Sequence, residues 1–393
     1  MSETAAAGAG SWGKRPFTTG IESSGAHPVE FRFSPARNGN RRLFVVFANF
    51  AAPQDYGFSN GVLDELGANV LWIRDQFEGQ RSYYLCKDMD FSLERSVQAL
   101  IGNVMKALDL TPDDCTLMGV SKGGSAALYF GLTYGYRDVI AIAPQFAVGT
   151  YVHEIHPKVA RFMTGGTPAP EAVRRLDALL PGTVRATAHK DTNVYLVSSV
   201  QDEQYTTQVE PFIGLFDDYD NFNFILSDSP FIADHTEVTR RNLPAVMGIA
   251  ALLAEGVAPR LGQVRNGFEE PGRDTSGIDA FLTSTPLVRE GFPAPTIVAP
   301  APGRTVSDGA AIRFEGTAPG AVRVSLWEDG TFLANRPVGA DGSWSWSPAT
   351  LWGEGPHTVR VYAVDARGLQ SPRTACGFRV AAGAGAAAQA AAA

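Results

Sequence analysis

The chain has 393 residues, of which 45% are hydrophobic and 19% charged, and its formal net charge is −8. This composition is typical of a globular protein with enough apolar residues for two domains. The acidic net charge gives no indication of a nucleic-acid-binding protein. The three cysteines, Cys86, Cys115 and Cys376, are too few and too scattered for a disulfide framework or a zinc site, so we expect reduced, buried thiols.

Residues 1–13 are small and polar, and residues 1–26 are predicted to form a flexible N-terminal segment. They lack the basic and then apolar pattern of a secretory signal. No apolar run reaches the length of a membrane span; the longest, residues 246–253, fits an amphipathic helix. We therefore predict a cytoplasmic protein with no stable membrane insertion.

Residues 27–256 alternate short apolar runs with helical patterns. Several of these runs are continuously apolar, which is typical of strands covered on both faces. The predicted strands are residues 29–33, 43–47, 70–73, 115–120, 139–143, 193–200 and 222–226. The predicted helices are residues 91–108, 171–180 and 237–253, and a further one follows Ser121. This order predicts an α/β fold with a mostly parallel sheet and helices on both faces.

A serine stands at the turn between one predicted strand and the next helix, in the sequence Gly119-Val120-Ser121-Lys122-Gly123. A serine hydroxyl is a weak nucleophile and must be exposed beside a base. A strained turn lifts it out of the sheet, and flanking glycines remove side chains that would collide there. The pattern predicts Ser121 as a catalytic nucleophile.

Two further residues complete a predicted catalytic triad, whose members follow one another along the chain in the order Ser121, Asp202, His235. Asp202 follows the strand at 193–200, and His235 follows the strand at 222–226. Both lie just past the carboxyl ends of strands, where open α/β sheets bind ligands. A neutral imidazole can take the serine proton, and a carboxylate orients that imidazole. Glu203 is the alternative acid, and Asp234 fits a helix cap.

Backbone N–H groups are expected to bind the oxyanion. The best candidates are Lys122 and, in the loop after residue 47, either Asn49 or Phe50. The side chain of Lys122 is interpreted as solvated at the start of its helix, and attraction of an anionic substrate is the alternative. No metal or cofactor is predicted, because His153 and His156 lack carboxylate or cysteine companions.

An insertion at residues 146–190 interrupts the alternation of strands and helices. It holds four prolines and short helical pieces. Insertions past the carboxyl end of a strand often cover a site. The sequence leaves two interpretations open, a lid over Ser121 and an insertion with no part in the site.

After residue 256 the alternation of apolar runs and helical patterns ends. Residues 257–295 predict a linker with one short helix near 278–283, and residues 382–393 predict an Ala/Gly-rich tail. Residues 296–381 carry short alternating strands separated by turns, which predicts a small β-sandwich. Four tryptophans there either pack in its core or form a sugar-stacking face: Trp327, Trp344, Trp346 and Trp352.

Residues 27–256 resemble an α/β-hydrolase domain. The segment Gly119-Val120-Ser121-Lys122-Gly123-Gly124-Ser125-Ala126-Ala127-Leu128, with Tyr129 and Gly131, resembles more narrowly the accessory Sec-system glycoprotein O-acetyltransferase family and capsular polysaccharide biosynthesis proteins. The pieces at 316–320, 341–344 and 357–359 resemble bacterial Ig-like repeats. The resemblance implies acyl chemistry on the glycans of a bacterial surface.

These observations leave three hypotheses. The first is a serine hydrolase or O-acyltransferase that forms an acyl-enzyme and acts on O-acetyl groups of a surface glycan or capsule polysaccharide. The second is a carboxylesterase of small substrates. The third is a non-catalytic assembly factor in a glycan export pathway. The expected partners are a carbohydrate or acyl-ester substrate and glycan-assembly or secretion proteins, without nucleic acid.

Overall fold

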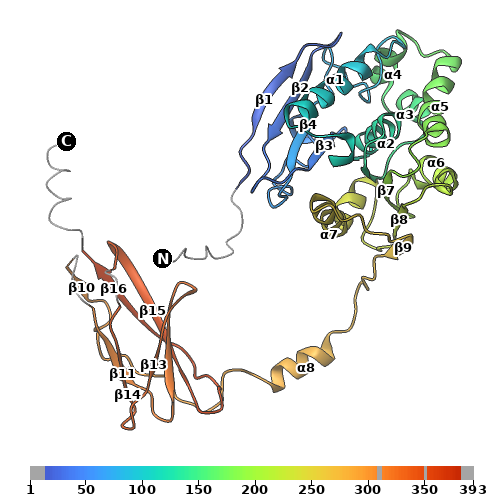
Figure 1. Ribbon diagram of the computed structural model, residues 1–393. Coiled ribbons are helices and arrows are strands. Elements are labelled where there is room, and N and C mark those ends of the chain that lie inside the picture. Colours follow the sequence, from blue (N-terminus) through green and yellow to red (C-terminus); the bar gives the residue numbers. More distant parts are fainter. Residues whose placement is uncertain (1–13, 308–311, 349–351, 382–393) are drawn as a thin grey trace, which may run out of the picture. The chain divides into compact units, whose positions relative to one another are not determined.

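The computed structural model describes residues 14–307, 312–348 and 352–381. The predicted tail at 382–393 and the first half of the predicted N-terminal segment therefore lie outside the described residues. The chain divides into two compact units, Met1–Pro271 and Gly272–Ala393. Each is described by itself (Figure 1).

The first unit is built on a sheet of nine described strands. The strands, in spatial order, are β1 (Thr18–Glu22), β2 (Val29–Ser34), β4 (Asn69–Ile73), β3 (Leu43–Phe47), β5 (Cys115–Val120), β6 (Asp138–Ile142), β7 (Asn193–Ser199), β8 (Phe222–Ser227) and β9 (Gln263–Asn266). Strands from β4 to β9 are parallel, whereas β1 and β2 are antiparallel to their neighbours. The predicted α/β fold with a mostly parallel sheet is confirmed.

Helices cover both faces of this sheet (Figure 1). They are α1 (Ser92–Ala107), α2 (Lys122–Tyr134), α3 (Val148–Ile155), α4 (Pro157–Thr164), α5 (Pro170–Ala186), α6 (Tyr205–Gln208) and α7 (His235–Ala254), with short 3₁₀ turns at Pro53–Asp55, Pro112–Asp114 and Glu210–Phe216. Val97 of α1, Ala127 of α2 and Leu180 of α5 pack in the core on one face. Val246 of α7 packs in the core on the other face. This double layer keeps the central strands dry, which explains their continuous apolar runs.

The sheet is wider than the sequence predicted at both ends. β1 lies inside the segment predicted to be flexible, and β9 lies inside the predicted linker, so the sheet continues beyond residue 256. Both are edge strands, and β9 reads Gln-Val-Arg-Asn with mostly exposed side chains. An edge strand of this kind buries little apolar surface, so it carries no apolar run that would reveal it.

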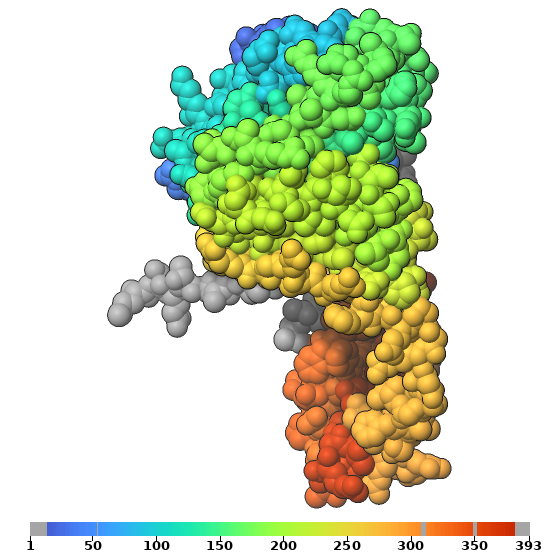
Figure 2. Space-filling view, turned by 90° about the vertical axis from the view of Figure 1, so that its right-hand side faces the viewer, coloured from blue at the N-terminus to red at the C-terminus, as the bar shows by residue number. Residues whose placement is uncertain are grey.

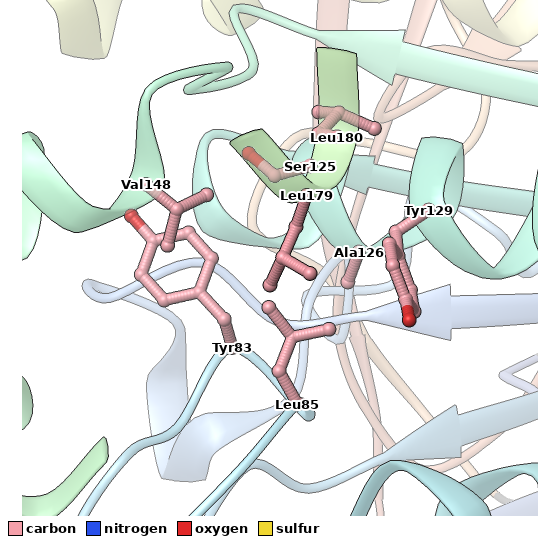
Figure 3. Close-up of a pocket in the computed structure, with 8 residues that line it drawn as sticks. All are labelled: Tyr83, Leu85, Ser125, Ala126, Tyr129, Val148, Leu179 and Leu180. Carbon is pink, nitrogen blue, oxygen red and sulfur yellow. The ribbon is translucent and has the colours of Figure 1, made fainter. Parts of the chain in front are cut away.

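The insertion at residues 146–190 is packed against the body of the unit. Val148 of α3 and Leu179 of α5 converge with Ala126 of α2 and with Leu85 (Figure 3). The void between these side chains is about 10 Å³, which is the lower limit for a single water. Figure 2 shows the insertion, in green, as a continuous part of the surface of this unit. Tight packing of this kind opposes large opening motions of α3 and α5.

The second unit contains one described helix and two sheets. The helix is α8 (Ser276–Ser284), and the strands are β10 (Thr305–Val306), β11 (Phe314–Thr317), β12 (Arg323–Glu328), β13 (Thr331–Pro337), β14 (Ser343–Trp346), β15 (Gly355–Val364) and β16 (Thr374–Val380). The strand order is β10-β16-β15-β12-β13 in one sheet and β11-β14 in the other. Leu326 and Phe378 of the larger sheet share a core with Phe314 of the smaller one.

The four tryptophans do not form one sugar-stacking face. Trp344 and Trp346 are buried in the core between the two sheets, and Trp352 packs against that core. Trp327 lies apart from them and meets the half-exposed Phe332 edge to face. Alternation along β14 turns Trp344 and Trp346 to the same side, which is the inner side.

Among the described residues, no helix combines the length and the apolar character that a membrane crossing requires. The three cysteines are buried and carry no disulfide. Burial raises the pKa of the Cys86 thiol to about 12, so this thiol is unreactive at neutral pH.

Candidate active site

Ser121 occupies a strained turn between β5 and α2. Its backbone has φ 55° and ψ −124°, a conformation that few residues other than glycine adopt. A Cβ on Gly119 would lie 2.3 Å from backbone atoms of Gly123, and a Cβ on Gly123 would lie 2.4 Å from the carbonyl oxygen of Phe47. Only glycine fits at these two positions, which explains the residues on either side of the serine.

The structure brings Asp202 and His235 together. His235 is the first residue of α7, and its Nδ1 lies 2.8 Å from Oδ2 of Asp202. Asp202 is only 3% exposed, and its Oδ1 accepts the backbone N–H of Gln204 at 2.9 Å. A buried carboxylate held in this way fixes the imidazole with Nε2 directed away from the acid.

The neighbouring acids have other partners. Glu203 accepts the backbone N–H of His235 at 2.9 Å through Oε2. Asp234 is the N-cap of α7 and accepts the backbone N–H of Thr236, as the sequence predicted. The imidazole contact therefore belongs to Asp202, while Glu203 holds the backbone of the same histidine.

Ser121 and His235 line one cavity of about 460 Å³. Nε2 of His235 is buried and has no hydrogen-bond partner among the described residues. Ser121 Oγ instead accepts a hydrogen bond of 2.7 Å from Nε2 of Gln145. The contact between serine and base is thus open in this state, as it commonly is in enzymes without substrate.

Gln145 is a site residue that the sequence reasoning missed. It is fully buried, its Oε1 accepts from the hydroxyl of Tyr83, and its backbone N–H donates to Oγ of Ser125. A second bond from Nε2, of 2.9 Å, reaches Gln204. Its position just past the carboxyl end of β6 is the signal that would have identified it, because ligands bind along that edge.

The interpretation of Lys122 as a solvated side chain is wrong. Its Nζ is fully buried, lies 2.7 Å from Oδ2 of Asp75 and stands 4.6 Å from the ring centre of Tyr84. Burial lowers the pKa of Lys122, and the attraction of Asp75 opposes that shift. Asp75 also accepts hydrogen bonds from Ser82 and from the backbone of Tyr83. The amphipathic start of a helix predicts exposure, but this side chain turns inward beneath the loop that follows β3.

The loop after β3 holds Asn49 and Phe50, the two candidates for the oxyanion donor that is predicted to act beside the backbone N–H of Lys122. The backbone N–H of Ala48 donates to the hydroxyl of Tyr84 at 2.8 Å, so Ala48 is not available to a substrate. Asn49 and Phe50 both line the cavity. The ring of Phe50 stacks on the ring of His156, with 3.9 Å between the centroids. These contacts fix the loop beside Ser121.

Two segments supply most of the lining of the cavity, residues 47–62 and the first turns of α7. Of the described residues in the insertion, Tyr151 alone lines it. Its walls are mainly apolar, with Phe58 and Leu243 among them. Among the described residues, no group of three or more His, Cys, Asp or Glu could hold a metal ion.

No protein-family model and no curated protein matches this chain. Solved structures match it at low identity. A capsule O-acetyltransferase of Neisseria meningitidis serogroup A is 19% identical, over 57% of this chain and 94% of that one, with a TM-score of 0.47. The fluorophosphonate-binding serine hydrolase F of Staphylococcus aureus is 13% identical, over 61% and 99%, with a TM-score of 0.47.

The glycosylation-associated protein complex Gap123 of Streptococcus agalactiae is a third match. It is 15% identical, over 68% of this chain and 45% of that one, with a TM-score of 0.42. Structures similar to this chain thus include a capsule acetyltransferase, a serine hydrolase and a glycosylation-associated protein complex.

Proposed function

We propose that this chain is a serine-dependent hydrolase or O-acyltransferase that works through an acyl-enzyme on Ser121. One observation carries the proposal: His235 lines the same cavity as Ser121, is paired with Asp202 through Nδ1, and has a buried Nε2 without a hydrogen-bond partner among the described residues. A buried imidazole nitrogen without a partner is costly for stability. It is useful where a reacting hydroxyl must be deprotonated.

The reaction follows from the roles of these groups. Ser121 Oγ leaves Gln145, attacks the ester carbonyl carbon and gives its proton to Nε2 of His235. The backbone N–H groups of Lys122 and of Asn49 or Phe50 hold the oxyanion. The alcohol then leaves with the proton from His235, and the acyl group stays on Ser121. Water or a second hydroxyl attacks this ester, again through His235, and frees the serine.

For the substrate we propose an O-acetyl group on a bacterial surface glycan or capsule polysaccharide. The resemblance of residues 119–131 to glycan O-acetyltransferases and capsule proteins supports this choice. The cavity, at about 460 Å³, has room for a sugar residue beside the ester. We also propose that the chain acts in the cytoplasm, before export of the glycan, with glycan-assembly proteins as partners.

A second candidate is a carboxylesterase of small substrates. The mainly apolar lining, with Phe58, Val62 and Leu243, favours it, because apolar walls offer few hydrogen-bond partners to the hydroxyls of a sugar. Both candidate functions proceed through the same acyl-enzyme. They differ in the alcohol part of the substrate ester, which is a glycan in one and a small molecule in the other.

Labelling with a fluorophosphonate probe, followed by intact-mass measurement, tests the shared step. The native chain should gain one probe, and Ser121→Ala should gain none. Ser59→Ala is the matched control, since Ser59 lines the same cavity, and it should label like the native chain. Labelling that survives in Ser121→Ala would refute the proposal. Acetylated and de-acetylated oligosaccharides offered to the active chain then separate a glycan enzyme from a simple esterase.

A further inference from the structure

A second cavity adjoins the first. Its volume is about 40 Å³, and Phe58 and Ser59 line both cavities. Its other walls come from the segment before β1, from β2, from β4 and from the turn near Asp64. The catalytic groups described above lie outside it, so it has no role in the reaction as written.

Positive charge is in excess around this cavity. Lys14, Arg15 and Arg32 line it, against one carboxylate, Asp64. The guanidinium of Arg15 is bound by neutral groups, the Ser34 hydroxyl and backbone carbonyls. Within the described part of the chain, therefore, no direct ion pair cancels the charge of Arg15. Asp64 accepts the backbone N–H of Arg15 at 3.3 Å.

Two residues that line this cavity each carry a buried donor without a hydrogen-bond partner among the described residues. They are Nε of Arg32 and Nε1 of Trp72, and Trp72 is only 6% exposed. The two residues are paired across β2 and β4, so their side chains leave the same face of the sheet. Buried donors in native proteins are nearly always satisfied by protein, water or ligand.

The guanidinium of Arg32 is held in a fixed plane. Its carbon lies 4.1 Å from the ring centre of Tyr56 and 4.8 Å from that of Phe17, and one terminal nitrogen donates to Gln54. Stacking of this kind fixes the direction of Nε at little further entropic cost. A preorganised cation beside a second fixed N–H is a good receptor for oxygen atoms that carry negative charge.

We propose that this cavity binds an oxyanion, a carboxylate or phosphoryl group, through Arg32 Nε and Trp72 Nε1. A volume of 40 Å³ has room for about three waters at 10–15 Å³ each, and hence for a small oxyanion in their place. Because Phe58 and Ser59 border both cavities, the oxyanion is a charged group on the substrate or acyl donor. That assignment rests on the proposed function; a free inorganic anion is the other source of the same chemistry.

Binding of inorganic phosphate tests the site without any reaction. Titration should raise the unfolding temperature of the native chain and change its tryptophan emission, with saturation. Arg32→Gln and Trp72→Phe should each weaken the apparent affinity at least tenfold, and Trp72→Phe should also remove the emission change. Arg95→Gln is the control, because it removes the same positive charge as Arg32→Gln from an exposed position on α1. It should bind phosphate like the native chain. Equal, unsaturable effects in all four proteins would overturn the proposal.

A matched pair of esters tests the source of the oxyanion. The two share one acyl group, and the alcohol is neutral in one and carries a carboxylate in the other. The ratio of kcat/KM, charged over neutral, should exceed ten in the native chain and in Arg95→Gln and fall toward one in Arg32→Gln. A ratio near one in the native chain, with phosphate binding intact, assigns the site to a free anion. If the chain hydrolyses neither ester, the proposed function is contradicted. The phosphate titration still decides whether the cavity binds an oxyanion.

Discussion

Nε2 of Gln145 lies 2.7 Å from Oγ of Ser121 and donates a hydrogen bond to it. The proposed nucleophile thus accepts a hydrogen bond from an amide, while Nε2 of His235, the proposed base, has no hydrogen-bond partner among the described residues. In the proposed reaction, Ser121 Oγ leaves Gln145 and gives its proton to Nε2 of His235 as it attacks the substrate. The following predictions start from this arrangement.

Replacing Gln145 with Leu should speed the first step. A neutral hydrogen bond contributes a net 0.5–1.5 kcal/mol, so its loss should raise the rate constant of fluorophosphonate labelling by about two- to tenfold. Stopped-flow or gel-based labelling at several probe concentrations measures it. Gln204→Leu, which removes a partner of Gln145 but no contact to Ser121, is the control. Slower labelling in Gln145→Leu would show that the amide aids the attack.

The triad predicts a ranked set of losses in esterase activity. Ser121→Ala and His235→Ala should each lower kcat by about a million-fold, because the two act as a unit. Asp202→Asn should lower kcat by about ten-thousand-fold, because the amide would hold the imidazole in the wrong tautomer. Glu203→Gln should cost much less, since Glu203 contacts only the backbone of His235. If Glu203→Gln is the more severe of the two, the acid is assigned to the wrong residue.

The buried pair of Lys122 and Asp75 predicts a large effect on stability. Lys122→Met leaves an unpaired carboxylate in the interior, which costs about 3–5 kcal/mol of the free energy of unfolding. Urea denaturation followed by fluorescence measures this. The double change Lys122→Met with Asp75→Asn should recover a large part, because the amide still accepts from Ser82 without carrying charge. If the double variant is no more stable than Lys122→Met, the loss of stability comes from altered packing and not from the unpaired charge.

His156 predicts a dependence of stability on pH. Burial, with a smaller contribution from Arg81, lowers the pKa of His156 below its usual value of 6.5. The unfolded chain therefore binds this proton at a higher pH than the folded one, and stability falls as the pH drops below about 6.5. His156→Phe keeps a ring against Phe50 and should reduce the loss of melting temperature of the first unit between pH 7.5 and 5. If the melting temperature of His156→Phe falls with pH as steeply as that of the native chain, other groups govern the pH dependence.

The position of β9 predicts where the chain can be shortened. A chain that ends after Pro271 should fold and still react with the fluorophosphonate probe, because it keeps the whole first unit. A chain that ends at residue 260 loses β9, exposes the edge of β8 and should be less stable or insoluble. Circular dichroism and gel filtration of the two chains compare them. Equal behaviour would show that β9 contributes little to the sheet.

The sequence predicted the central strands and the serine turn because each is dictated locally. Buried parallel strands require continuous apolar runs, and the turn at Ser121 requires glycine at 119 and 123. Gln145 and the inward course of Lys122 depend on tertiary contacts with Tyr83 and Asp75, distant in sequence. No periodicity or short motif records such contacts, so they could be found only in the folded chain.

The polar character of β1 and β9 has a consequence for the behaviour of the protein at high concentration. A long parallel sheet with bare, apolar edges would recruit strands from other copies and grow into aggregates. Here the central apolar strands lie between two outer ribbons with largely exposed side chains, among them Thr18, Gln263 and Arg265. Charged and hydrated side chains at the rims of the sheet, beside the exposed Ile21 and Val264, oppose further strand pairing. We therefore expect the weak apolar pattern that conceals these strands in the sequence to limit aggregation as well.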